Sequence, residues 1–203
     1  AISTKENELD ILAKNIHAKR AEAIPVLTNK LASILELLGM ANARFNIQLN
    51  AKDDYFANGK DEIQFLFSAN KGSDFGLLKK VASGGEMSRI MLAVKSILSQ
   101  YSKLPTIIFD EIDTGVSGEI AHKMGEIMKQ MSTTMQVFAI THLPQIAGKG
   151  SEHFKVYKTV KDNQTQSELK LLTQEERITE IAQMLSGANI SESALNHAKE
   201  LLN

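Results

Sequence analysis

The sequence has 203 residues, of which 43% are hydrophobic and 23% charged, with a formal net charge of −1. This composition is typical of a folded domain, and the balanced charge gives no overall electrostatic case for or against nucleic acid. Cysteine is absent, which excludes disulfides, zinc–thiolate centres and a thiol nucleophile. No apolar run approaches the roughly 18 residues of a membrane helix, and no secretory signal is visible. We therefore expect a cytoplasmic location and no membrane partner.

The first predicted element is a long helix over residues 3–38. Its apolar residues recur at steps of three and four on both sides of Pro25, which is the spacing of one helix face. Gly39 stands where a C-terminal cap is expected. An ordinary amphipathic helix and the end of a coiled-coil arm both fit this pattern. The periodicity alone favours the ordinary helix, because two heptads are too few for a coiled coil.

The remainder of the chain alternates between short strands and helices. A buried strand over 106–109, a helix over 118–131 and a second buried strand over 136–140 form a unit typical of a parallel crossover. The other predicted elements are half-buried strands 45–49 and 63–67 around Asn58–Gly59, a helix over 84–101, a hairpin of 153–160 and 167–172 around 161–166, and helices 174–185 and 191–202.

One candidate site opens the helix at residue 84, within the stretch "ASGGEMSR". Ser83 and Glu86 have the spacing of a capping box, which has a purely structural explanation. A cap does not require two glycines, however, and Gly84 and Gly85 leave the first backbone N–H groups of the helix unshielded. That geometry is suited to a phosphate at the positive end of the helix dipole.

A second candidate site lies where the two strands of the crossover end. Asp110 and Glu111 follow the first strand, and His142 follows the second. The carboxyl ends of neighbouring parallel strands meet at the edge of the sheet where ligands bind. An acid pair capping a turn and a histidine satisfied in a loop are the structural alternatives. The convergence of these residues on one edge favours a functional site.

The loop that normally grips nucleotide phosphates is absent. The pattern Gly-x-x-x-x-Gly-Lys-Ser/Thr does not occur, although the glycine-containing turn "DTGVSG", residues 113–118, directly follows the acids. We therefore expect one half of a split site. The sequence begins with Ala1 and not with methionine, which also fits a piece of a longer protein.

Taken in order, the motifs resemble the C-terminal half of RecN, a family of bacterial double-strand-break repair ATPases of the SMC and ABC class. The similarity runs from about Leu31 to the C-terminus, and Met87 replaces an expected leucine. The segments that carry it are "VASGGEMSRIMLAVKSIL", "IIFDEIDTGVSG", "ITHLPQIAGKG", "ERITEIAQMLSG" and "SALNHAKELL".

The resemblance implies a fold and a domain organisation. The fold is α/β, the C-terminal lobe of an ABC/SMC-type P-loop ATPase head with a mostly parallel sheet, preceded by a long coiled-coil-type helix. Residues 1–40 would be the end of the arm that returns to the head, and residues 41–203 would be the lobe. The resemblance thus favours the arm over the ordinary helix.

The resemblance also implies roles for the residues that follow the two strands. Asp110 would hold Mg²⁺ and Glu111 would be the general base. His142 would be the switch histidine that touches the γ-phosphate of ATP. Asp113 would begin the loop that links the two sites of a dimer.

The helix start would be the signature motif, in which Ser83, Gly84, Gly85 and Glu86 meet ATP held by the opposite head. The implied partners are the N-terminal half of the same protein, a second copy in a homodimer of heads, and DNA in a nucleoid-associated complex. We expect ATP hydrolysis by the full-length protein and no activity from this segment alone, because it lacks the Walker A loop. A non-hydrolysing scaffold and, less favoured, a Mg²⁺ phosphatase are the alternatives.

Overall fold

The computed structural model describes residues 2–102, 104–161 and 164–203. The chain divides into two compact units, residues 1–97 and 98–203, and the division falls within a single helix. The division that the resemblance implies near residue 40 stays a prediction.

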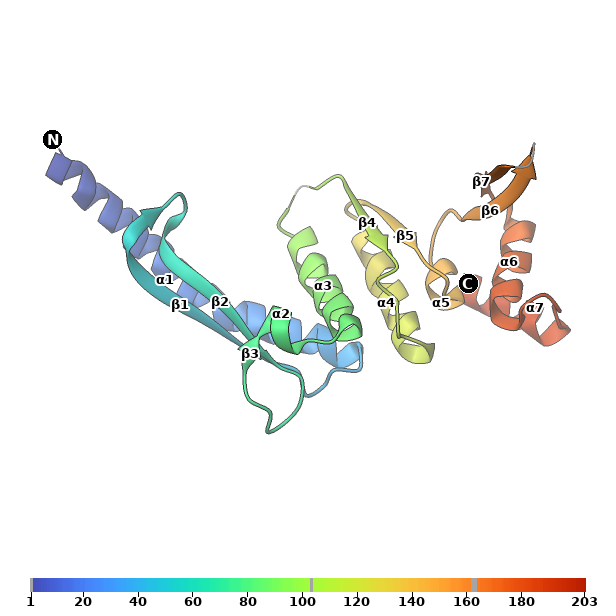
Figure 1. The fold of residues 1–203 in the computed structure, drawn as a ribbon, viewed down its shortest axis with the longest axis horizontal. Helices are drawn as coiled ribbons and strands as arrows, with labels where there is room; N and C mark the ends of the chain where they lie inside the picture. The colour runs from blue at the N-terminus through green and yellow to red at the C-terminus, as the bar shows by residue number, and fades with distance from the viewer. Residues whose placement is uncertain (1, 103, 162–163) are drawn as a thin grey trace. The chain divides into compact units, whose positions relative to one another are not determined.

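The first unit combines a long helix with an antiparallel sheet of order β1-β2-β3 (Figure 1). Its elements are α1 (Ile2–Leu37), β1 (Arg44–Phe56), β2 (Gly59–Ser68), β3 (Gly76–Leu77), α2 (Leu78–Val81) and α3 (Gly84–Ser99), of which α3 continues into the second unit.

The long helix α1 ends as predicted. Gly39 has a φ of 74°, and the N–H of Met40 donates to the carbonyl of Leu35 at 2.8 Å, which closes the last turn. The C-terminal half of α1 is anchored by Leu31 and Leu35, which are fully buried. The predicted apolar face of the N-terminal half is not buried in the same way, because Leu9 is exposed.

The β1–β2 hairpin runs beside α1 (Figure 1). The buried carboxylate of Asp61 accepts hydrogen bonds from His17 Nδ1 at 2.6 Å and from Arg20 at 2.9 Å. Further along, Asp10 accepts from the hydroxyl of Tyr55 at 2.6 Å and from Lys60 at 3.1 Å. These contacts join the helix to the hairpin, in which the strands extend beyond the predicted segments 45–49 and 63–67.

The second unit contains a parallel pair of strands, an antiparallel hairpin and four helices among the described residues. Its elements are β4 (Thr106–Asp110), α4 (Gly118–Met131), β5 (Gln136–Ile140), α5 (Pro144–Ala147), β6 (Phe154–Lys161), β7 (Gln164–Leu171), α6 (Gln174–Ser186) and α7 (Glu192–Leu202). The helices α6 and α7 pack through a small apolar core that includes Ile181 and Ala198. No helix in the described part of the chain is both long and apolar enough to cross a bilayer.

The parallel crossover is confirmed, but the burial of its strands is not. β4 and β5 pair in parallel, with Ile108 opposite Phe138 and Asp110 opposite Ile140. Phe109 is buried, whereas Ile108 is 62% exposed and Phe138 and Ile140 are also exposed. The expectation of two fully buried strands is therefore wrong, because one face of the pair has no cover among the described residues.

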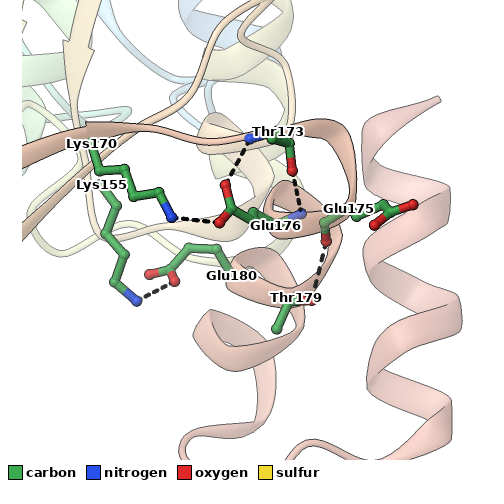
Figure 2. Close-up of polar contacts among 7 residues, drawn as sticks. All are labelled: Lys155, Lys170, Thr173, Glu175, Glu176, Thr179 and Glu180. Carbon is green, nitrogen blue, oxygen red and sulfur yellow. Dashed lines mark hydrogen bonds and ion pairs between the residues drawn. The ribbon is translucent and has the colours of Figure 1, made fainter.

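The β6–β7 hairpin turns its charged face towards α6. Lys155 forms an ion pair with Glu180, and Lys170 forms one with Glu176 (Figure 2). Glu176 also forms a capping box with Thr173 at the start of α6. The opposite face is exposed and mostly apolar. It carries Phe154, Val156, Val160, Leu169 and Leu171, together with Lys158, Thr165 and Ser167. Within the predicted connection 161–166, residues 162–163 lie outside the described residues.

Candidate functional site

The acid pair and the histidine lie at the same edge of the β4–β5 pair. Asp110 is the last residue of β4, and it lies opposite Ile140, the last residue of β5. The N–H of Glu111 donates to the carbonyl of Ile140 at 3.0 Å, which continues the ladder by one step beyond the strands. His142 follows two residues after β5 ends. The parallel register therefore brings the sequence-predicted Asp110, Glu111 and His142 to one sheet edge.

Glu111 has an unusual backbone. Its φ of 47° is in the left-handed region, and no other non-glycine residue of the described chain has a positive φ. Non-glycine residues in this region carry strain and are frequent at functional sites. The hydroxyl of Thr114 donates to the carbonyl of Glu111 at 2.9 Å, which helps to hold the chain in this conformation.

The two carboxylates are exposed and make no side-chain hydrogen bond or ion pair with the described residues. Free carboxylate oxygens suit Mg²⁺, which typically binds one or two carboxylates and keeps waters or substrate phosphates in its remaining positions. The described residues contain no group of three or more histidine or carboxylate side chains that would form an all-protein metal cage. The donor set at Asp110 thus fits a magnesium ion that is shared with a phosphate.

Asp113 differs from its neighbours because it is buried. Its side chain is 1% exposed, and its Oδ2 accepts a hydrogen bond from the hydroxyl of Thr141. His142 is 68% exposed, and its Nδ1 lies 4.0 Å from Oδ1 of Asp113. Asp113 was predicted to be a binding residue, but its burial does not favour direct contact with a ligand.

The turn after Asp113 has the expected glycine conformation. Gly115 and Gly118 have φ values of 74° and 59°, and the N–H of Val116 donates to the carbonyl of Asp113 at 3.1 Å. Only glycine adopts such angles without a steric cost. The exposed turn leads directly into α4, which begins at Gly118 as predicted.

The helix start in the first unit has the predicted capping box. The Glu86 carboxylate accepts from the N–H of Ser83 at 2.8 Å, and the N–H of Glu86 donates to the Ser83 hydroxyl at 3.4 Å. A Cβ added at Gly84 would have no neighbour within 4 Å. Gly84 is therefore not required by packing, and the space in front of Gly84 is open.

Arg89, which the sequence analysis did not single out, connects this helix to the end of α1. Its Nε donates to the carbonyl of Gly85 at 3.1 Å, and its Nη1 donates to the carbonyl of Leu38 at 3.0 Å. One side chain thus holds the first turn of α3 against the last residues of the long helix. The contact between Arg89 and Gly85 could be predicted from the sequence, because residues four apart in a helix are neighbours. The contact with Leu38 could not, because Leu38 is 51 residues away from Arg89.

The relatives of the chain are DNA repair proteins. It is 46% identical over 191 residues to DNA repair protein RecN of Rickettsia conorii, covering 94% of this chain and 35% of that protein. It is 46% identical over 185 residues to RecN of Deinococcus radiodurans, covering 91% of this chain and 32% of that protein. The chain therefore spans about one third of the length of these relatives. No protein-family model matches it.

The fold resembles SMC head domains. The Smc head with a coiled coil and joint from Pyrococcus yayanosii matches with a TM-score of 0.62 at 18% identity, over 83% of this chain and 30% of that one. The Smc head with an extended coiled coil from Pyrococcus furiosus, bound to the C-terminal domain of ScpA, matches with a TM-score of 0.60 at 19% identity, over 86% and 41%. Over most of its length the chain is therefore similar in sequence to about one third of DNA repair protein RecN, and its fold is that of SMC head domains.

Proposed function

We propose that this chain is the C-terminal, catalytic-edge half of an ATPase head that hydrolyses ATP during DNA repair. The observation that carries the proposal is the convergence of Asp110, Glu111 and His142 on one edge of a parallel strand pair. The relatives' name, DNA repair protein, supports the process and makes DNA the expected partner of the full-length protein. We propose on the same ground that the full-length protein acts in the cytoplasm, in association with the nucleoid.

In this proposal each residue at the sheet edge has one task. Glu111, exposed and free of other side chains, accepts a proton from the attacking water as the general base. Asp110 holds Mg²⁺, which neutralises charge on the β- and γ-phosphates when it is bound. His142 contacts the γ-phosphate through its exposed ring.

The helix start of α3 would serve the nucleotide of a second copy. The open space at Gly84 and the N–H groups of Gly84 and Gly85 at the start of the helix suit a phosphate that approaches along the helix axis. In this arrangement Ser83 and Gly85 flank the phosphate, and Glu86 holds Ser83 in place through the capping box. The active assembly would then be a homodimer of heads.

The phosphate loop would come from the N-terminal half of the same protein. Two exposed apolar sheet faces support this proposal. One is the β4–β5 face with Ile108, Phe138 and Ile140, and the other is the outward face of the β6–β7 hairpin. Exposed apolar faces of this kind mark sites that another segment covers. About two thirds of the relatives' length lies outside this chain, which is ample for such a cover.

This arrangement predicts that the chain alone does not hydrolyse ATP. Calorimetry with Mg-ATP before and after addition of the separately produced N-terminal half tests this prediction. Micromolar binding of Mg-ATP by the chain alone would contradict the split site. A stable complex of the two halves without turnover would favour the non-hydrolysing scaffold instead.

The substitution Glu111→Gln in the full-length protein tests the proposed base. An amide cannot accept the proton, so turnover should fall by about 10²- to 10⁴-fold while ATP binding is retained. Glu152→Gln, the same change at an exposed position of a loop, is the matched control and should leave both unchanged. Turnover of Glu111→Gln within a few-fold of wild type would remove Glu111 from this role.

A further inference from the structure

The Asp113 carboxylate is buried but only half satisfied. Its Oδ2 accepts from the hydroxyl of Thr141, whereas its Oδ1 has no hydrogen-bond partner among the described residues. Buried polar atoms in folded proteins are nearly always paired, so an orphan oxygen on an ionisable group calls for an explanation.

The group that faces this oxygen is the ring of His142. The distance of 4.0 Å between Oδ1 and Nδ1 is too long for a hydrogen bond by about 1 Å. The ring of His142 is exposed and is the side chain that would move to close this gap, because Thr141 already holds the buried Asp113. The Thr141 hydroxyl also accepts from the N–H of Leu143 at 3.0 Å. Through Thr141, the buried carboxylate thus holds the turn that carries the histidine.

We propose that Asp113 is a positioning residue that orients His142 and keeps a proton on its Nδ1. The inference rests on the proposed function of His142 at the γ-phosphate. An ionised carboxylate is an acceptor only, so it selects the ring form in which Nδ1 is a donor. The opposite ring atom, Nε2, is then the one presented to the terminal phosphate, in a fixed orientation.

This role accounts for the burial of Asp113, which direct contact with a ligand does not. The turn residues that follow, Thr114, Gly115 and Ser117, are exposed and remain available to a partner. The loop after β4 therefore has two parts, a buried aspartate that acts inside its own head and an exposed turn that can face another.

A double-mutant cycle in the full-length protein tests the inference. Asp113→Asn keeps the volume of the side chain but places an amide donor near Nδ1. It should lower kcat by about 10- to 100-fold, the range seen when a carboxylate that orients a metal-bound histidine is changed, with ATP affinity within about twofold of wild type. In a His142→Ala background the same change should have no further effect, because Asp113 acts through the ring.

The outcomes separate this inference from the proposed function. If Asp113→Asn lowers kcat equally in both backgrounds, or leaves kcat unchanged in the wild type, the positioning role is wrong. If His142→Ala itself leaves turnover unchanged, the proposed role of His142 fails as well. If Asp113→Asn does not fold, the same double-mutant cycle is measured with Thr141→Val. This change removes the hydroxyl that donates to Asp113 at nearly constant side-chain volume. Asp54→Asn on an exposed part of the hairpin is the matched control.

Discussion

Replacing Glu111 by glycine should stabilise the protein although it removes the proposed base. A non-glycine residue in the left-handed region costs about 1–2 kcal/mol, and the φ of 47° places Glu111 there. Glycine removes that cost but adds about 0.4–1 kcal/mol of entropy to the unfolded chain. At the midpoints of these two ranges, the net gain of Glu111→Gly over Glu111→Ala is about 0.8 kcal/mol. Both substitutions delete the same side chain, so their difference isolates the backbone.

Urea and thermal unfolding of the two variants measure this difference. For a chain of this length the gain corresponds to about 1–4 °C in Tm. An alanine variant as stable as the glycine variant would show that the left-handed conformation carries no strain. The expected result would mean that the site retains a strained residue at the cost of stability, as functional sites often do.

Two further predictions concern stability away from the site. Hydrogen bonds from His17, and more weakly from Arg20, hold the pKa of Asp61 below its ordinary value of 3.8. On acidification, Asp61 is therefore protonated in the unfolded chain at a higher pH than in the folded chain. The contribution of Asp61 to the free energy of unfolding is complete above about pH 5, and it is lost as the pH falls through 3.8 towards the lower pKa of the folded state. Asp61→Asn should cost about 1–3 kcal/mol at pH 7 and flatten this acid dependence in urea titrations between pH 3 and 7, and an unchanged pH profile would contradict the assignment. Gly148→Ala should cost about 1–3 kcal/mol, because the new Cβ would lie 2.8 Å from the carbonyl oxygen of Leu201, and wild-type Tm in a thermal melt would show that the helices there yield easily.

Local signals in the sequence predicted the elements well. The helix over 118–131 begins and ends as predicted, because a glycine turn precedes it and its apolar residues keep a helical period. The parallel pairing of β4 and β5 follows from the length of the connection between them, which requires a crossover. The sheet edge with Asp110 and Glu111 was therefore predictable from spacing alone.

Contacts between distant residues were not predictable in this way. The buried Asp113 is hydrogen-bonded to Thr141, which is 28 residues away. The buried Asp61 of the β1–β2 hairpin is hydrogen-bonded to helix residues more than 40 positions earlier. The exposure of Ile108 has a different origin. An apolar strand predicts a buried environment, but burial also needs a second layer, and none of the described residues covers Ile108.

The ties between the long helix and the β1–β2 hairpin have a mechanical consequence. They hold α1 at Asp10 and again at His17 and Arg20, which lie about 10 and about 15 Å further along the helix axis. Two separate sets of hydrogen bonds resist rotation of the helix about its own axis relative to the hairpin. A pull or twist applied to the far end of the helix would therefore pass into the sheet as torque, and Gly39 would not act as a free hinge. In this unit the helix and the hairpin would therefore move together as one body.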